Sequence, residues 1–393
     1  MALMIFELIS RHNPMIFFLF SKRKYTFLRF LLPLFMFLFL FSCEGQNQQT
    51  KTTNHSFTSL SYGRKVDTLC DSLITIYHDA KGNYWFGSYG HGVYRFDGKQ
   101  LIQYETQDGL LSNVVVRIQE DQQGRIFLDT RDGINYFENG LLQTLSVNPI
   151  DTTWGSYASS DLWFGAAWNK NAVLRFDGKH LYRYSLPTNP VGDSILKLFP
   201  GNAWSPYDIY SLYKDRKGVL WIGTSNAGVY RFDGKHLNWL YEHQISMTPE
   251  GGSFGIRSVL EDLQGYYWFC NTKYKYSIDT VNLSFGKALN YSKTENNLPI
   301  STKKGKRMIY FLSSLIDQDT TMWFLTYEEG IWCYDGRNLS EYHIEEDNKE
   351  IKLYAIYTDK QGRVWVSTHK AGAWYFNGKK FVKFSPNEFQ SDE

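Results

Sequence analysis

Seven short loops carry the side chains of this sequence that are best suited to bind a ligand. The loops differ from one another, whereas the strand-like segments around them repeat. Four loop residues carry aromatic rings that can stack on the apolar face of a sugar: Tyr89, Trp168, Tyr274 and Tyr327. Four more can hydrogen-bond hydroxyls or charged groups: Arg131, Lys170, Asn226 and Glu328. Because residues that do not repeat are better functional candidates than those that do, we predict a ligand-binding face at these loops.

Two histidines, His91 and His369, lie in equivalent loops of the first and last repeat. Closure of the repeats into a ring would make these loops neighbours, so we include both histidines among the candidate ligand-binding residues. A paired site for a metal or for general-base work is the alternative. The sequence contains no G-x-S-x-G, H-E-x-x-H or phosphate-binding glycine loop. We therefore predict no catalytic residue, no metal and no cofactor.

Other reactive side chains recur at fixed places, which favours structural roles. His180 and His236 both follow Asp-Gly-Lys and are interpreted as turn-exit residues. The arginines at one recurring strand position are likewise expected to stabilise the fold: Arg95, Arg175 and Arg231. Beyond residue 43 there are three cysteines, without C-x-x-C spacing, so neither a zinc site nor a disulfide framework is indicated. We expect Cys270 and Cys333 to be small buried strand residues.

The loops must be positioned by the repeats, and seven repeats can be counted. Each contains one marker aromatic residue: Trp85, Phe127, Trp163, Trp221, Trp268, Trp323 and Trp365. Their mean spacing is about 47 residues, which is typical of four-stranded propeller blades. In the repeat that contains Trp221, we expect strands near 209–214, 219–224, 229–232 and 237–241. The third repeat is compressed and the fifth is degenerate.

The pattern predicts an all-β fold: one seven-bladed β-propeller over residues 61–386, with four-stranded antiparallel blades. Asp-Gly pairs between the last two strands of several repeats predict type I′ hairpin turns. An open β-solenoid is the alternative. Whether residues 57–66 add a strand to the last blade is left open. The longer segments 187–206 and 247–254 are expected to flank the ligand face, which surrounds the central channel.

Three recurring motifs resemble the two-component regulator propeller repeat. They are Val93-Tyr-Arg-Phe-Asp-Gly-Lys99, Asp108-Gly-Leu-Leu-Ser-Asn113 and Leu220-Trp-Ile-Gly-Thr224. The resemblance covers about residues 66–384. It implies an extracytoplasmic sensor domain, in that family often for carbohydrates and fused to a histidine kinase. No kinase or DNA-binding segment follows the propeller in this sequence, so the resemblance implies ligand sensing or binding and leaves the signalling partner open.

Charge argues against nucleic acid as a partner. The whole chain has a formal charge of +2, but residues 1–42 hold five basic residues and one acidic residue. The rest has 37 basic and 39 acidic residues and lacks the basic surface that nucleic-acid binding needs. Aromatic residues make up 17% of the chain, which favours pleated, half-buried surfaces and agrees with a β fold.

The N-terminus has the pattern of a targeting segment. A basic stretch over 21–29 precedes twelve apolar residues, 30–41, and Leu40-Phe-Ser-Cys43 resembles the lipobox of bacterial lipoproteins. We predict a signal peptide over 1–42, lipidation of Cys43 and a flexible tether over 43–60. A plain secretory signal and an uncleaved anchor helix are the alternatives, and Met15 is an alternative start.

These observations lead to one functional hypothesis and two alternatives. The hypothesis is a lipid-anchored, extracytoplasmic, non-catalytic propeller that binds a small molecule or an oligosaccharide on its loop face. It would touch the membrane only through the lipid. The first alternative is a protein-interaction platform in a complex of the cell envelope. The second is an enzyme, because streptogramin lyases are also seven-bladed propellers.

Overall fold

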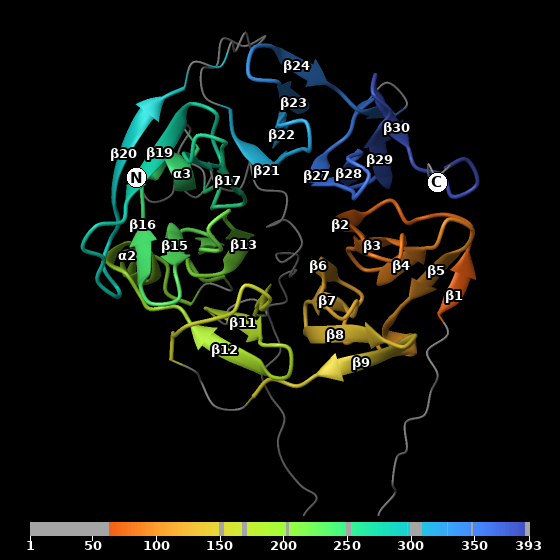
Figure 1. Cartoon of the computed structure of the whole chain (residues 1–393), viewed down its shortest axis with the longest axis horizontal. Helices are drawn as coiled ribbons and strands as arrows, with labels where there is room; N and C mark the ends of the chain where they lie inside the picture. The colour runs from red at the N-terminus through yellow and green to blue at the C-terminus, as the bar shows by residue number, and fades with distance from the viewer. Residues whose placement is uncertain are drawn as a thin grey trace, which may run out of the picture. The chain divides into compact units, whose positions relative to one another are not determined.

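Seven antiparallel sheets follow one another in chain order around a central opening (Figure 1). The computed structural model describes residues 63–148, 153–166, 171–201, 204–248, 253–296, 298, 309–327, 329–346 and 349–389. The predicted signal peptide, Cys43 and the tether lie outside these residues. The predicted seven-bladed propeller with four-stranded antiparallel blades is confirmed, and two blades vary the pattern.

The strands of the first three blades have these bounds. Blade one contains β1 (Arg64–Val66), β2 (Leu73–His78), β3 (Tyr84–Ser88), β4 (Val93–Phe96) and β5 (Leu101–Tyr104). Blade two contains β6 (Val115–Glu120), β7 (Ile126–Thr130), β8 (Gly133–Glu138) and β9 (Leu141–Leu145). Blade three contains β10 (Leu162–Gly165), β11 (Ala172–Phe176) and β12 (Leu181–Ser185).

The other four blades have four strands each. Blade four contains β13 (Ile209–Lys214), β14 (Leu220–Thr224), β15 (Val229–Phe232) and β16 (Leu237–Leu240). Blade five contains β17 (Val259–Glu261), β18 (Tyr267–Phe269), β19 (Tyr274–Asp279) and β20 (Asn290–Glu295). Blade six contains β21 (Phe311–Ile316), β22 (Met322–Thr326), β23 (Ile331–Tyr334) and β24 (Leu339–Tyr342). Blade seven contains β27 (Leu353–Thr358), β28 (Val364–Thr368), β29 (Ala373–Phe376) and β30 (Phe381–Lys383).

Short elements connect the blades. A 3-10 turn, η1 (Thr106–Asp108), follows blade one, and a small hairpin of β25 (Glu345–Glu346) and β26 (Lys349–Glu350) precedes blade seven. Helix α2 (Pro190–Leu198) begins after Asn189, whose side chain accepts the backbone N–H groups of the first turn. Helix α3 (His243–Ser246) follows blade four.

An aspartate holds the turn between the first two strands of a blade and explains why the marker tryptophan recurs. In blade four, Asp215 Oδ1 accepts the backbone N–H groups of Lys217 and Val219 at 3.0 and 2.9 Å. Its Oδ2 accepts Trp221 Nε1 at 3.1 Å. The same Asp–Trp bond occurs in blades one, five, six and seven. Each Trp thus closes the turn that precedes its own strand.

Blade two shows how this turn survives without tryptophan. Phe127 has no N–H to donate, and Arg125 Nε instead donates to Asp121 Oδ2 at 2.7 Å. The Arg125 guanidinium also lies 5.5 Å from the centroid of the Phe127 ring. Aromatic packing and carboxylate hydrogen bonding, which one tryptophan supplies elsewhere, are therefore shared here by two residues.

The Asp-Gly hairpins form as predicted, but their type I′ geometry was wrong. In blade one, four residues from Asp97 to Gln100 connect the paired residues Phe96 and Leu101. Gly98 has φ 87°, whereas Asp97 and Lys99 are not in the positive-φ region. Asp97 Oδ1 instead accepts the N–H groups of Lys99 and Gln100 at 2.9 and 2.7 Å. The aspartate side chain therefore closes a longer loop than type I′ requires.

The recurring turn and strand residues have the expected structural roles. The backbone N–H groups of His180 and His236 donate to the Asp-Gly aspartates, as turn-exit residues should. Three arginines each pair in register with a marker tryptophan: Arg95, Arg175 and Arg231. Arg175 Nε donates to Asp161 at 2.6 Å, and Arg231 Nη1 donates to Asp233 at 3.0 Å. These ion pairs fix the sheets from within.

The core lies between neighbouring blades, and the ring closes through such a core. Trp365 of blade seven packs among Phe86, Phe384 and Phe389, with ring centroids 5.3 to 6.1 Å apart. Across the same boundary, Tyr84 Oη donates to Asp359 Oδ2 at 2.8 Å. β1 pairs with β5 in blade one. The open question about residues 57–66 is thus answered for 64–66, which extend the first blade rather than the last.

Blade three has three strands because the chain follows another route at its start. Val147 bridges Leu181 in parallel, on the far side of β12 from β11. Further along, Trp154 Nε1 donates to the Ser185 carbonyl at 2.8 Å, and the Trp154 ring packs 4.8 Å from that of Phe232 in blade four. Among the residues described, none forms an inner strand beside β10. The compression seen in the third repeat is therefore the loss of this strand.

Candidate functional site

The first strand of each regular blade lies nearest the central opening (Figure 1) and contains a β-bulge near its start. The pairing skips one residue in each of five blades: Ile74, Val116, Tyr210, Leu312 and Tyr354. Each stands eleven residues before its marker aromatic, and Arg257 holds this place in blade five. Because a bulge bends the strand and re-aims a side chain, these positions can be directed at the channel.

The bulge positions divide by chemistry. Three carry aliphatic side chains, in blades one, two and six: Ile74, Val116 and Leu312. The other three carry tyrosine, arginine and tyrosine, in blades four, five and seven: Tyr210, Arg257 and Tyr354. A channel that only had to be filled would not need two phenols and a guanidinium. The second set is therefore the better candidate for binding.

Arg257 is held in place by its neighbours. Its Nε donates to the carbonyl of Phe254 at 2.9 Å, and its backbone N–H donates to Cys270 Sγ at 3.0 Å. The guanidinium carbon lies 4.8 Å from the centroid of the Tyr210 ring and 5.5 Å from that of Phe254. A cation between two ring faces is attracted to both. The charged group is thus positioned before any ligand arrives.

Gly255 makes this packing feasible. Its φ is 73°, and a Cβ at this residue would lie 2.7 Å from the Tyr210 ring. Only glycine combines the positive φ with so close a ring. The segment that precedes blade five, which we expected to flank the ligand face, therefore supplies Phe254 and Gly255 as supports for Tyr210 and Arg257.

Two further pairs come from loops of other blades. The Tyr354 and His369 rings, both of blade seven, meet edge to face with centroids 4.9 Å apart. Arg131 of blade two lies 5.7 Å from the centroid of the Tyr89 ring, and its Nη2 donates to the Tyr89 hydroxyl at 3.3 Å. Tyr89 exposes 45% of its surface. Each pair combines an aromatic face with a nitrogen-bearing side chain.

Electrostatics show that these side chains converge. Burial raises the pKa of Tyr354, the charge of Arg257 lowers it, and Tyr89 and Tyr210 raise it. Groups from blades one, four and five are thus close enough to act on one hydroxyl of blade seven. We call the set Tyr89, Tyr210, Arg257, Tyr354 and His369 the channel mouth.

The channel mouth is surrounded by protein and yet open to water. Tyr210 exposes 42% of its surface, although burial raises its pKa. His369 is exposed, and its pKa is lowered by burial, then by Lys352 and Lys370. A side chain inside a water-accessible channel has both properties, because protein replaces bulk solvent on most sides. Such side chains are accessible enough to contact a ligand.

The structure brings some predicted residues to the channel mouth and places others elsewhere. Tyr89, His369 and Arg131 lie there, and Tyr327, 48% exposed, meets the Phe254 ring at right angles. His91 is exposed in the same loop as Tyr89, and its backbone N–H donates to Ser88 Oγ. Trp168, Lys170 and Glu328 lie outside the described residues.

Asn226 and Tyr274 face the body of the propeller. Asn226 is 8% exposed, and its Oδ1 accepts the hydroxyl of Ser253. Tyr274 is also 8% exposed, with the Nζ atoms of Lys273 and Lys293 4.9 and 4.5 Å from its ring centroid. Both side chains already have protein partners, which makes them supports of their loops.

Sequence reasoning missed Tyr210, Arg257 and Tyr354. They lie at the start of inner strands or just before one, whereas the residues predicted from the sequence lie in the loops between second and third strands. Both regions meet at one end of a blade, as the pairing of Leu73 with Ser88 shows in blade one. The signal was present: the position eleven residues before each marker aromatic varies from repeat to repeat.

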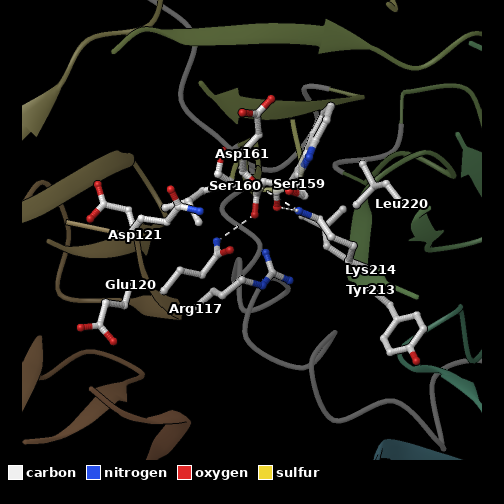
Figure 2. Close-up of a pocket in the computed structure, with 14 residues that line it drawn as sticks. Arg117, Glu120, Asp121, Ser159, Ser160, Asp161, Tyr213, Lys214 and Leu220 are labelled. Atoms are coloured by element: carbon white, nitrogen blue, oxygen red, sulfur yellow. Dashed lines mark hydrogen bonds between the residues drawn. The ribbon is translucent and has the colours of Figure 1, made fainter. Parts of the chain in front are cut away.

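A second hollow lies at the other end of the inner strands, where blade three lacks its own (Figure 2). It is a cavity of about 420 Å³ between the ends of β6 and β13. Its lining includes charged residues of both signs: Arg117, Glu120, Asp121, Asp161 and Lys214. We call it the blade-three cavity.

The polar groups of the blade-three cavity bond to the protein itself. Gln119 Nε2 donates to the carbonyl of Trp163 at 2.8 Å, at the edge of β10 that has no partner strand. Asp129 Oδ2 accepts the N–H of Gly165 on the same edge at 3.1 Å. Side chains of blade two therefore replace ladder bonds that the missing strand would have made.

The charges of the cavity are paired in the same way. Arg117 Nη1 donates to Asp129 Oδ2 at 3.2 Å. Figure 2 shows Lys214 directed at Ser159 and Asp161, whose carbonyls accept its Nζ at 2.9 and 3.1 Å. Burial raises the pKa of Asp129 to about 6, although Arg117 and the Gly165 N–H oppose this shift. The polar side chains around the cavity are thus engaged in stabilising the fold.

Within the described ranges, no three His, Cys, Asp or Glu side chains are grouped to hold a metal ion. No described helix is long and apolar enough to cross a membrane. The three cysteines of the described part are free thiols, and Cys270 is buried.

Comparison with solved structures supports the fold. One similar structure is the extracellular domain of the hybrid two-component system BT3049 from B. thetaiotaomicron, with 18% identity and a TM-score of 0.54 over 83% of this chain and 41% of that chain. The corresponding domain of BT4673 is 18% identical, with a TM-score of 0.53 over 79% of this chain and 39% of that chain. Virginiamycin B lyase from Staphylococcus aureus is 15% identical, with a TM-score of 0.52 over 79% of this chain and 97% of that chain. The chain thus spans about 40% of the sensor domains, and at these identities the likeness is one of fold.

Sequence comparison finds a family match in two of the blades. No curated protein matches the chain. The family model described as "Two component regulator propeller" matches residues 203–226 and 346–370. The first segment contains Tyr210 and β14, and the second contains Tyr354 and β28. These two segments, in blades four and seven, are thus similar to the two-component regulator propeller repeat.

Proposed function

We propose that this propeller binds an oligosaccharide at the channel mouth and acts outside the cytoplasm as a non-catalytic ligand-binding or sensor domain. One observation carries the proposal: tyrosines and an arginine from four blades lie close to one another at positions where the repeats differ. The repeated residues are engaged in turns and sheets, whereas these residues are not needed for them.

The residue types suit a sugar. A tyrosine offers an apolar ring face, which matches the C–H face of a pyranose, and a hydroxyl that can bond the sugar hydroxyls. Tyrosine also loses little conformational freedom on binding, since it has only two side-chain torsions. Tyr89, Tyr210 and Tyr327 each expose between 42% and 48% of their surface. Such exposure of large aromatic side chains around one opening favours a binding site.

The comparisons support the sensor reading of this site in part. Two structures of the same fold are described as extracellular domains of two-component systems. Lyases share the fold as well, so fold alone does not decide between binding and catalysis. At the channel mouth, His369 packs on the Tyr354 ring, and burial lowers its pKa. A neutral imidazole is compatible with either role, so turnover has to be measured as well as binding.

Titration calorimetry with a panel of oligosaccharides tests the proposal on the purified protein. We expect saturable binding by at least one glycan, and Tyr210→Ala to weaken it about 30-fold, as loss of a central aromatic contact does. Tyr291→Ala is the matched control, because Tyr291 is 37% exposed but lies on the outer strand β20. Absence of glycan binding, or equal losses in both variants, would contradict the proposal.

The same samples distinguish the alternatives. Chromatography of glycans after long incubation should show no product; a product that disappears with His369→Ala would support the lyase alternative. Co-purification of a stoichiometric protein partner, without glycan binding, would support an interaction platform. Trp168→Ala remains a test of the blade-three loop and is expected to weaken binding.

We also propose that the protein is held to a membrane by lipid on Cys43. The motif Leu40-Phe-Ser-Cys43 after a basic and apolar segment supports this. Labelling of cells with a fatty-acid analogue should mark the wild-type protein and leave Cys43→Ser unlabelled. Label retained by Cys43→Ser would contradict lipidation at this residue.

A further inference from the structure

We infer that the channel mouth selects acidic oligosaccharides and binds a carboxylate of the sugar through Arg257. This inference rests on the proposed function and specifies its ligand class. It comes from the one fixed charge at the bulge positions and from the groups that surround it.

The geometry of Arg257 leaves its carboxylate-binding edge available. Nε is engaged by the Phe254 carbonyl, and the guanidinium carbon lies over the rings of Tyr210 and Phe254. In the described part of the chain, no carboxylate forms an ion pair with Arg257. The two terminal NH₂ groups form a planar fork, which matches the two oxygens of a carboxylate. A neutral sugar would satisfy this fork less well.

The surrounding charges are mainly positive. Lys352 and Lys370 act on His369, and Arg131 lies against Tyr89. One described acid, Asp208, acts on Tyr210, but it is 9% exposed and its Oδ2 accepts the N–H of Ser205 at 3.0 Å. That carboxylate is directed to its own turn. An incoming anion therefore meets cations from blades two, five and seven.

Protein around the site increases the effect of charge. Burial raises the pKa of Tyr210 and Tyr354, so protein replaces part of the water around this group of side chains. A ligand that displaces water from Arg257 without replacing its hydrogen bonds would leave a desolvated charge, which is unfavourable. An acidic ligand avoids this cost. Selection is thus expected from the penalty on neutral sugars as much as from attraction of acidic ones.

Matched sugars test the inference. Oligogalacturonate, oligomannuronate and hyaluronan fragments would each be titrated beside their carboxyl-reduced forms, which differ in charge and keep the ring. We expect at least one acidic member to bind at least ten-fold more tightly than its reduced form. Its affinity should fall as salt rises from about 50 to about 300 mM, because screening weakens ion pairing.

Variants then assign the selectivity. Arg257→Gln should remove most of the ten-fold preference, and Arg257→Lys should retain part of it, because lysine keeps the charge without the fork. Arg64→Gln is the control: Arg64 lies on β1, and its side chain is 62% exposed and bonded to Gln103. Thermal unfolding of each variant establishes that folding is intact.

The outcomes separate this inference from the proposed function. Binding of acidic and reduced sugars with equal affinity, or a preference that Arg257→Gln leaves unchanged, overturns the inference while glycan binding stands. Failure of every sugar, acidic and neutral, contradicts the proposed function itself. Preference for reduced sugars also overturns the inference.

Discussion

The channel mouth and the blade-three cavity lie at opposite ends of the inner strands and contain similar residue types. They differ in the hydrogen-bond partners of their polar side chains. In the cavity, Gln119 bonds to a backbone carbonyl of β10 and Lys214 to backbone carbonyls of the loop before it. At the mouth, none of the described carboxylates pairs with the fork of Arg257, and Tyr89 and Tyr210 keep much of their surface exposed. A cavity lined by charged residues is therefore weaker evidence for a ligand site than hydrogen-bond donors that are accessible beside exposed aromatic rings.

The open edge of β10 and the cavity beside it should matter for stability and not for binding, and Asp129→Ala gives the largest effect. It leaves the Gly165 N–H without its acceptor and Arg117 without its partner, in a place that is almost fully buried. We expect the free energy of unfolding to fall by about 3 kcal/mol, since breaking a buried pair costs about 3–5 kcal/mol and Arg117 is partly exposed. Urea unfolding measures this loss, and calorimetry on the folded fraction should show unchanged glycan affinity. A loss of affinity without loss of stability would reverse our assignment.

The pKa of Asp129 makes a second prediction. Its carboxyl has a pKa of about 6 when folded and 3.8 ordinarily. Between these values the folded protein keeps a proton that the unfolded chain has lost. The free energy of unfolding should therefore fall as pH rises from about 4 to about 6, and the fall attributable to this group is about 2 kcal/mol.

Asp129→Asn provides the control for this pH effect. Asparagine keeps an acceptor for the Gly165 N–H but cannot ionise. Urea unfolding at a series of pH values should show that wild type loses stability relative to Asp129→Asn across the window, while other carboxylates contribute equally to both proteins. A constant difference between the two proteins would show that Asp129 has an ordinary pKa.

The sequence predicted the fold well because the repeated residues have repeated physical tasks. The Asp–Trp pair closes one turn and the Asp-Gly pair closes another, so blades could be counted from these residues alone. The third blade differed because Trp163 is present while none of the described residues before it forms an inner strand. Its marker packs on Trp154 instead, with ring centroids 6.3 Å apart, and spacing does not reveal such a detour.

The site was predicted in part, for a related reason. Position in a loop indicates that a residue is near the channel face but not which way its side chain points, so Asn226 and Tyr274 were chosen together with Tyr89. Bulges decide direction at the inner strands. Because a bulge depends on pairing with the next strand, its consequence for Tyr210 and Tyr354 becomes visible only in the folded sheet.

At the mouth, Gly255→Ala should separate strain from displacement of Tyr210. The new methyl would meet the Tyr210 ring at 2.7 Å at a residue with φ 73°. We expect a stability loss of about 1–2 kcal/mol and weaker glycan binding. Gly218→Ala is the matched control, because Gly218 has φ 80° and open space around its Cβ position. It should lose stability but bind normally; equal binding by the two variants would argue against a role for Tyr210.

The smallest effect is expected at Gln119, and it tests whether the cavity has a structural role alone. Gln119→Met keeps the length of the side chain and removes the N–H that bonds the Trp163 carbonyl at 2.8 Å. One such hydrogen bond contributes about 1 kcal/mol, which urea unfolding can resolve. If the cavity residues only stabilise the fold, the free energy of unfolding of this variant should fall by that amount, and it should bind glycans as wild type does. A change in glycan affinity with unchanged stability would mean that the opening left by the lost strand takes part in binding, and the two ends of the channel would then form one site.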